Sequence, residues 1–251
     1  VPVAVKALCD IAGVRTGAGT EVLAVYVPDT DATVVSRLEE AGAVLVGSLT
    51  MTEGASAVHH PSIEPPRNPW DEQAWAGASS SGSGVATAAG LCFGSLGSDT
   101  AGSIRAPSHF CGVVGLKPTY GRVSRAGVFP LSATLDHVGP MTRTVADCAA
   151  MLGVLAGPDE RDPTSRQITV PEYLRELEQP LQGFRIGYDE QYSSEGVAPE
   201  LADAVRGAMG VLEGVGAVVE PIVVPRREPA LCASPSPFRR SHARTQRPGS
   251  A

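Results

Sequence analysis

The sequence of 251 residues lacks several patterns that identify familiar kinds of site. Neither of its two glycine-rich stretches carries the lysine of a P-loop or the G-x-G-x-x-G spacing of a dinucleotide-binding turn. No serine stands in a G-x-S-x-G elbow, and the five histidines form no H-E-x-x-H or other metal-binding spacing. These absences argue against P-loop phosphate binding, the ordinary α/β-hydrolase nucleophile and a metal site.

Lysine and cysteine are also scarce. The chain has two lysines, Lys6 and Lys117, among its 20 basic residues. The five cysteines are widely scattered: Cys9, Cys92, Cys111, Cys148 and Cys232. Such spacing is typical of neither a zinc site nor a disulfide framework, so we expect a reducing, cytoplasmic location.

Long apolar runs are missing as well. No run reaches the roughly 18 residues of a membrane-spanning helix, and no signal-peptide pattern opens the chain. We therefore expect no membrane association. The net charge of −7 argues against direct binding of nucleic acid. The hydrophobic fraction of 43% is sufficient for a core in one large domain or two small ones.

Two stretches rich in glycine and serine stand close together, at 77–84 and 97–105, with an apolar run between them at 85–93. Glycine and serine allow tight turns in which several backbone N–H groups point at one spot. Such loops bind either phosphate or a developing oxyanion. The missing P-loop lysine favours the oxyanion.

The segment 75–157 resembles the amidase signature family. Five phrases carry the resemblance in the same order: Gly77–Gly84, Gly94–Arg105, Cys111–Thr119, Tyr120–Arg125 and Leu135–Arg143. Any one glycine-rich loop would be weak support, but five ordered phrases are specific. The resemblance extends less closely to residue 1 and to about residue 225. It implies an α/β fold with a mixed, largely parallel sheet covered by helices on both faces, incomplete in this chain.

Members of this family hydrolyse amides with a Ser-Ser-Lys triad. By motif, the resemblance makes Ser103 the nucleophile, Ser79 the middle serine and Lys6 the base. A serine needs a base to take its proton, and lysine serves only when neutral, a state that burial favours. Ser79 would relay the proton because a hydroxyl both donates and accepts. We expect no metal and no cofactor.

The resemblance also assigns the oxyanion hole, to the backbone N–H groups of Thr100, Ala101, Gly102 and Ser103. Asp99 and Arg105 flank this loop, and we expect them to form an ion pair that braces it. Ala101 replaces the family's usual glycine. If that position needs a positive φ, its Cβ adds strain of about 1–2 kcal/mol.

Each candidate also has a structural interpretation. Ser79 could be a turn residue, Ser103 a helix N-cap and Lys6 a solvated surface charge. The family phrases favour the catalytic roles. A histidine base at His137 is the least favoured interpretation, and Ser80, Ser81 and Ser83 are expected to bond loop backbone.

Strand-like and helix-like segments alternate, which predicts a covered α/β sheet. We expect strands at 1–6, 43–47, 184–188 and 217–224. We expect helices starting at residue 31 and at 84–93, 144–156 and 199–216. A Thr144–Asp147 capping box opens the third helix, and Pro199 opens the fourth.

The last 26 residues differ from the rest. From Arg226 onward the chain holds six arginines, one glutamate and several prolines and serines, with no periodicity. We expect a partial amidase signature domain at 1–225, with a catalytic core at 75–157, followed by an aberrant tail at 226–251. A frameshift in a GC-rich gene is our hypothesis for the tail, and a genuine basic, disordered tail is the alternative.

Three functions stay open. The first is an amidase acting on a small-molecule amide, and the second is the glutamine-hydrolysing A subunit of an aminoacyl-tRNA amidotransferase, which works with partner subunits. The third is an inactive fragment or binding module, since the resemblance puts much of the substrate pocket in a half that is absent here. A homodimer is also open. The sequence does not name the amide.

Overall fold

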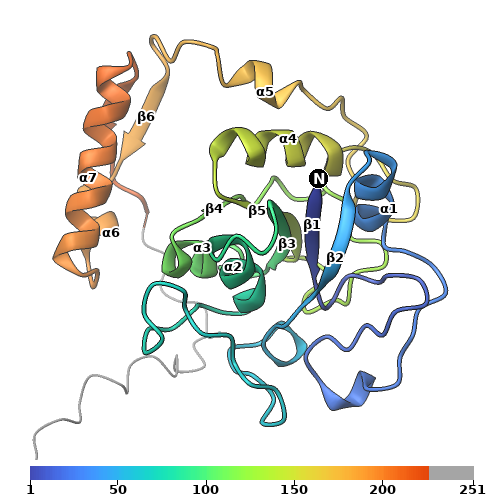
Figure 1. The fold of residues 1–251 in the computed structure, drawn as a ribbon. Helices are drawn as coiled ribbons and strands as arrows, with labels where there is room; N and C mark the ends of the chain where they lie inside the picture. Colours follow the sequence, from blue (N-terminus) through green and yellow to red (C-terminus); the bar gives the residue numbers. More distant parts are fainter. Residues whose placement is uncertain (226–251) are drawn as a thin grey trace, which may run out of the picture. The chain divides into compact units, whose positions relative to one another are not determined.

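The computed structural model describes residues 1–225 (Figure 1). They form two compact units, one spanning residues 1–178 and one that begins at residue 179. The predicted tail at 226–251 lies outside the described residues. All candidate site residues belong to the first unit.

The first unit is built on a five-stranded sheet of order β2-β1-β3-β5-β4. Its strands are β1 (Pro2–Lys6), β2 (Val44–Leu49), β3 (Gly94–Asp99), β4 (Val114–Gly115) and β5 (His137–Thr142). β1 pairs in parallel with β2 and β3, whereas β5 is antiparallel to β3 and β4. The expectation of a mixed α/β sheet is confirmed.

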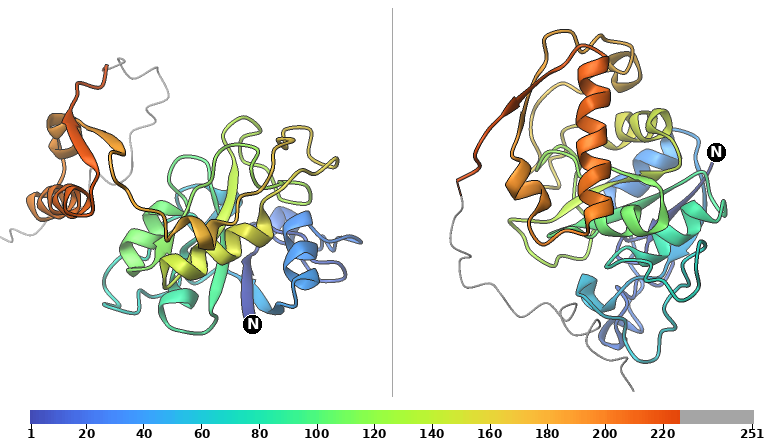
Figure 2. Two further views of the ribbon diagram at one scale, coloured as in Figure 1. Left: turned by 90° about the horizontal axis from the view of Figure 1, so that it is seen from above. Right: turned by 90° about the vertical axis from the view of Figure 1, so that its left-hand side faces the viewer.

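Helices cover both faces of this sheet (Figures 1 and 2). One core joins Val3 and Val5 of β1 to helices α1 (Thr33–Glu40) and α4 (Val145–Leu155). A smaller cluster joins Ala4 to Ala86 of α2 (Ser81–Ala88) on the opposite face. Because side chains alternate along a strand, Lys6 continues the row of Ala4.

Two helices form for reasons visible in the sequence. Residues Val34, Val35 and Leu38 make the buried face of α1. At the start of α4, the Thr144 hydroxyl accepts a hydrogen bond from the Asp147 N–H at 3.1 Å. That bond satisfies one of the free donors at a helix N-terminus. The predicted helix and its Thr144 N-cap are confirmed, while the Asp147 carboxylate accepts the Thr144 hydroxyl at 2.7 Å.

The segment between the glycine-rich loops differs from our expectation of a helix at 84–93 followed by a loop. α2 ends at Ala88, and residues 94–99 form β3, which is buried along its whole length. Glycine and serine are poor strand formers, but this strand needs small residues. A Cβ on Gly97 would come within 2.8 Å of the Met141 sulfur and 3.0 Å of the Ser80 hydroxyl.

Shorter elements complete the first unit: α3 (Arg105–Cys111), α5 (Tyr173–Glu176) and two 3-10 turns at Glu21–Leu23 and Glu53–Ala55. The second unit pairs β6 (Arg185–Tyr188) in parallel with β7 (Val218–Pro221). It also contains α6 (Glu190–Ser194) and α7 (Pro199–Gly214), which begins at the predicted proline. Among residues 1–225, no helix has the length and apolar character to cross a membrane.

Candidate active site

The site begins with Lys6, the last residue of β1, which is 0% exposed. Its Nζ donates hydrogen bonds to the Ser79 hydroxyl at 2.6 Å and to the Ser98 hydroxyl at 2.8 Å. The structure thus brings together two residues that are 73 positions apart in the chain. Both partners are neutral hydroxyls.

Burial changes the chemistry of this lysine. It lowers the pKa of Lys6 from 10.5 to about 7, although Cys9, Asp99 and Asp136 act in the opposite direction. The charged form loses its hydration when the side chain is buried, and the neutral amine does not. Near neutral pH a large fraction of Lys6 is therefore an uncharged amine that can accept a proton.

Ser79 sits in a backbone turn that requires glycine two positions before it. Gly77 has a φ of +82°, and a Cβ there would lie 2.5 Å from the Pro107 Cα. The Ala78–Ser79 peptide bond is cis. The Ser79 carbonyl accepts the Thr52 N–H at 3.2 Å. Backbone packing on two sides therefore fixes the position from which the Ser79 hydroxyl meets Lys6.

Ser80 joins the two glycine-rich stretches. Its hydroxyl donates to the Ser98 carbonyl and accepts from the Ser98 N–H, both at 3.2 Å. Its own N–H donates to the Ser103 carbonyl at 3.3 Å. The main chain of Ser103 is thus bonded to the residue that follows Ser79. The predicted backbone-bonding role of Ser80 agrees with these contacts.

Asp99 and Arg105 brace the loop between them. The guanidinium donates to both carboxylate oxygens at 3.0 Å, and the N–H groups of Gly102 and Ile104 donate to the same carboxylate at 2.8 and 3.1 Å. Burial acts to raise the pKa of Asp99, but the hydrogen bonds from Arg105, Ile104 and Gly102 outweigh it and lower that pKa. Asp99 therefore stays ionised and holds residues 99–105 in one conformation.

Two details change what we expect of the oxyanion loop. Within residues 1–225 the non-glycine residues with positive φ are Ala18 and Ala55, so Ala101 carries no such strain. The positive φ of this loop belongs to Gly102, at +133°. The Gly102 N–H is also engaged by Asp99, so it points at the carboxylate rather than at a substrate.

Two residues of the site had no role in our sequence analysis. Ser98 is the second partner of Lys6, and Asp136 accepts the Thr100 hydroxyl at 2.5 Å. Asp136 stands in a family phrase, and its place in that phrase is the signal that could have drawn attention to it. Ser98 stands in the family phrase Gly94–Arg105 as well, but a serine among the glycines and serines of that phrase is not distinctive in sequence.

His137 is held by its neighbours in a way that leaves little scope for base chemistry. Its Nδ1 lies 2.7 Å from the Leu135 carbonyl oxygen, and its Nε2 lies 3.2 Å from Lys117 Nζ. A carbonyl accepts only from an N–H, so the proton sits on Nδ1 and Nε2 accepts from the ammonium. No group of three metal-binding side chains occurs among the residues that the structure describes.

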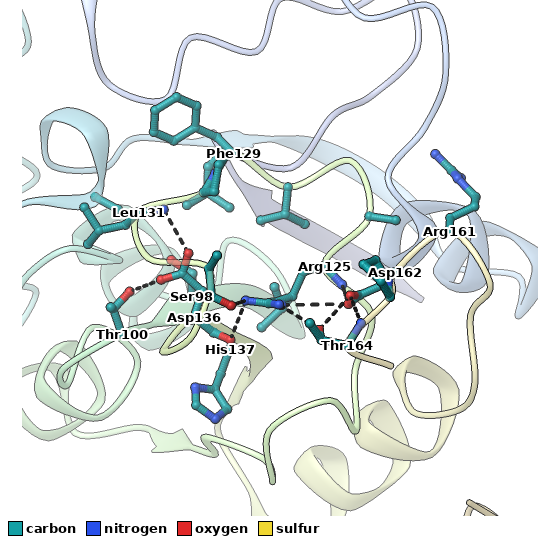
Figure 3. A pocket seen from close by; sticks show the side chains of 18 residues that line it. Ser98, Thr100, Arg125, Phe129, Leu131, Asp136, His137, Arg161, Asp162 and Thr164 are labelled. Carbon is teal, nitrogen blue, oxygen red and sulfur yellow. Dashed lines mark hydrogen bonds and ion pairs between the residues drawn. The ribbon is translucent and has the colours of Figure 1, made fainter. Parts of the chain in front are cut away.

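A pocket of about 260 Å³ lies next to the oxyanion loop and to Ser98, the second partner of Lys6. Ser98 and Thr100 form part of its wall, together with Leu8, Phe129 and Leu131 (Figure 3). We call it the Phe129 pocket. Lys6, Ser79 and Ser103 do not line it.

The chain is similar in sequence to known proteins. A family model described as Amidase matches residues 1–236, past the predicted boundary at residue 225. AmiD of Mycobacterium bovis, which carries the name of an amidase, is 58% identical over 177 residues, covering 70% of this chain and 37% of that protein. The A subunit of the glutamyl-tRNA(Gln) amidotransferase of Moorella thermoacetica is 48% identical over 235 residues, covering 93% and 48%.

Solved structures of proteins with amidase and amidotransferase names also resemble this chain. The A subunit of the glutamyl-tRNA(Gln) amidotransferase of Thermotoga maritima superposes with a TM-score of 0.85 at 39% identity, over 90% of this chain and 50% of that one. The native peptide amidase of Stenotrophomonas maltophilia gives 0.79 at 39% identity, over 90% and 48%. This chain spans about half the length, or less, of the relatives it matches.

Proposed function

The chain belongs to the amidase family, and from that premise we propose that it hydrolyses a carboxylic amide through an acyl-enzyme on Ser103. The observation that carries the proposal is the 2.6 Å hydrogen bond between the buried Lys6 amine and the Ser79 hydroxyl. Two such groups in contact make a proton path of the kind that activates a serine.

In the first half of the reaction Ser103 Oγ attacks the carbonyl carbon. Its proton passes to Ser79 Oγ, and the proton of Ser79 passes to Lys6 Nζ, which is neutral in part because its pKa is about 7. The C–N bond then breaks, and the proton returns along the same path to the leaving nitrogen. In the second half, water attacks the acyl ester, the carboxylic acid leaves and Ser103 regains its proton.

The negative charge on the carbonyl oxygen needs donors during both steps. We assign them to the N–H groups of Thr100, Ala101 and Ser103. Gly102 is left out of the set expected from the sequence because its N–H bonds Asp99 at 2.8 Å. Preorganised donors of this kind are each worth roughly 3–4 kcal/mol of barrier.

A second candidate is the A subunit of an amidotransferase, favoured by the 48% identity to such a protein over 93% of this chain. The same chemistry would then release ammonia from glutamine for a partner subunit. Ammonia release from simple amides by the protein alone favours the amidase. Ammonia release from glutamine that needs partner subunits and charged tRNA favours the amidotransferase.

A fluorophosphonate probe tests the nucleophile in either case. The folded protein should be labelled, Ser103→Ala should not, and Ser62→Ala should be labelled as the parent is. Ser62 is a suitable control because it is exposed and its hydroxyl bonds Glu21. Absence of labelling in a folded, full-length sample would instead favour the inactive alternative.

A further inference from the structure

The Phe129 pocket has a composition that restricts what can enter it. The pocket touches the surroundings of the proposed site at two places: at Ser98, whose hydroxyl bonds Lys6, and at Thr100, in the oxyanion loop. A group that lies in this pocket is in contact with the Thr100 end of the oxyanion loop, whereas Lys6, Ser79 and Ser103 do not line the pocket.

The wall holds equal numbers of positive and negative side chains: Arg125 and Arg161, and Asp136 and Asp162. Arg125 is the most enclosed of the cations. Its two NH groups donate to the carbonyls of Ala133 and Asp136 and to the hydroxyls of Tyr120 and Thr164.

The Nε of Arg125 faces the Asp162 carboxylate at 3.8 Å. That distance is too long for a hydrogen bond, so Nε is a buried donor without a hydrogen-bond partner. Because Nε is buried and both terminal nitrogens donate within the protein, the guanidinium has no free donor that a ligand can reach.

The two carboxylates are occupied in the same way. Asp162 accepts the Arg125 N–H at 2.8 Å and two donors of Thr164, and Asp136 accepts Thr100 together with the N–H groups of Leu131 and Ser132. Dashed lines in Figure 3 mark these bonds within the drawn cluster. A carboxylate that accepts from several donors is already satisfied and gains little from a ligand cation.

Arg161 is the exception. It is exposed, and its guanidinium donates to the Asp31 carbonyl at 3.2 Å. In Figure 3 it lies apart from Ser98 and Thr100, beyond Asp162. Its charge is therefore remote from the position of the reacting carbonyl.

His137 also lines the pocket, with its ring nitrogens in contact with Lys117 and the Leu135 carbonyl, and the other side chains near the site are apolar. Leu8 and Val138 are buried, and Val128 and Phe129 are half-buried, with Leu131 next to them. These side chains gain contact with an apolar group and offer nothing to a charged one. Their position next to Ser98 and Thr100 makes the inner part of the pocket hydrophobic.

We propose that the Phe129 pocket holds the acyl chain of the substrate and selects an uncharged, apolar one. The proposal rests on the proposed amidase function and narrows its substrate class. For a primary amide the leaving group is ammonia, so the acyl chain is the only part that needs a pocket. A volume of about 260 Å³ lies just under the usual range for drug-sized ligands, which fits a short acyl chain.

Fluorophosphonates that differ only in the end of a butyl chain test the proposal, because the chain stands where the acyl group would. One chain ends in methyl, one in sulfonate and one in trimethylammonium. We expect the methyl probe to label Ser103 at least about 50-fold faster than either charged probe, since a charge in the pocket would lose water and gain no partner. Equal or faster labelling by a charged probe overturns the proposal and leaves the hydrolase function standing. Absence of labelling by all three contradicts the function itself.

A matched pair of variants tests whether this pocket is the part of the protein that selects the acyl chain. Leu131→Ala removes an apolar contact from the pocket and should slow the butyl probe by between about threefold and tenfold, while a methylphosphonofluoridate keeps its rate. Leu135→Ala is the control: Leu135 is exposed, belongs to the same loop and does not line the pocket. If the two variants change the butyl rate equally, the pocket is not the acyl site.

Discussion

Two neighbouring strands of the sheet end in buried ionisable groups with opposite properties. Lys6 ends β1 and Asp99 ends β3, and both side chains are 0% exposed. Asp99 receives charged and neutral donors and its pKa is lowered, so it keeps its charge. Lys6 has two hydroxyls as partners and its pKa falls to about 7. Partner chemistry, rather than burial alone, separates a structural charge from a reactive group.

The largest effect on the labelling rate is expected at Lys6. Lys6→Met keeps an unbranched side chain of similar length but has no base, so fluorophosphonate labelling of Ser103 should fall by about 10²–10⁴-fold. The folded state should be retained, because the variant also removes a charge whose burial is costly. Labelling rates and far-UV circular dichroism measure the two effects. Lys117→Met, at a half-buried lysine outside the triad, is the control. Retained labelling in the Lys6 variant would remove Lys6 as the base.

The opposite pattern is expected at Asp99. Asp99→Ala leaves the Gly102 and Ile104 donors and the Arg105 guanidinium without their common acceptor. Asp99 is 0% exposed but the Arg105 side chain is 54% exposed, so water can solvate the freed guanidinium. The cost comes mainly from the loop N–H groups left without an acceptor, about 1–3 kcal/mol. Urea unfolding should therefore show a clear loss of stability, which Lys6→Met does not. An Asp99→Ala protein as stable as the parent would show that the brace carries no structural energy.

How much of this arrangement could be read from the sequence depends on the kind of signal. Family phrases and apolar flanks single out Lys6 and Ser79, and the capping box locates α4. The strand β3 was missed because local propensity argues against Gly-Ser-Leu-Gly-Ser-Asp as a strand. Only the packing of Met141, Ile104 and Ser80 around Gly97 explains it.

The hydrogen bond from the Gly102 N–H to Asp99 could not be predicted from the sequence either. It depends on where the Asp99 carboxylate points, which is a matter of three-dimensional hydrogen bonding. The same holds for Ser98, whose meeting with Lys6 joins residues 92 positions apart. Motifs indicate which residues react, while the residues that position them emerge only when strands are placed side by side.

The pH dependence of labelling sharpens the contrast between the two strand ends. Lys6 must be neutral to act, so the labelling rate should rise with pH through about 7 and level off above it. Ser98→Ala removes an acceptor that stabilises the ammonium form. The midpoint should then shift to lower pH. A midpoint that is unchanged in Ser98→Ala, or a flat profile in the parent, would contradict the link between this contact and the base.

The smallest effect on the labelling rate is expected at Asp136, whose carboxylate links Thr100 of the oxyanion loop to the loop at residues 131–132. Asp136→Asn keeps an acceptor for either the Thr100 hydroxyl or the loop N–H groups of Leu131 and Ser132, but weakens the charge-assisted bonds to both. The loss of about 1 kcal/mol in positioning corresponds to a roughly fivefold slower labelling rate. Asp147→Asn, at the exposed start of α4, is the control. Because Asp136 also acts to raise the pKa of Lys6, its neutralisation should move the pH midpoint to lower values, in the same direction as Ser98→Ala. An unchanged labelling rate in Asp136→Asn would contradict the positioning of Thr100 by this carboxylate.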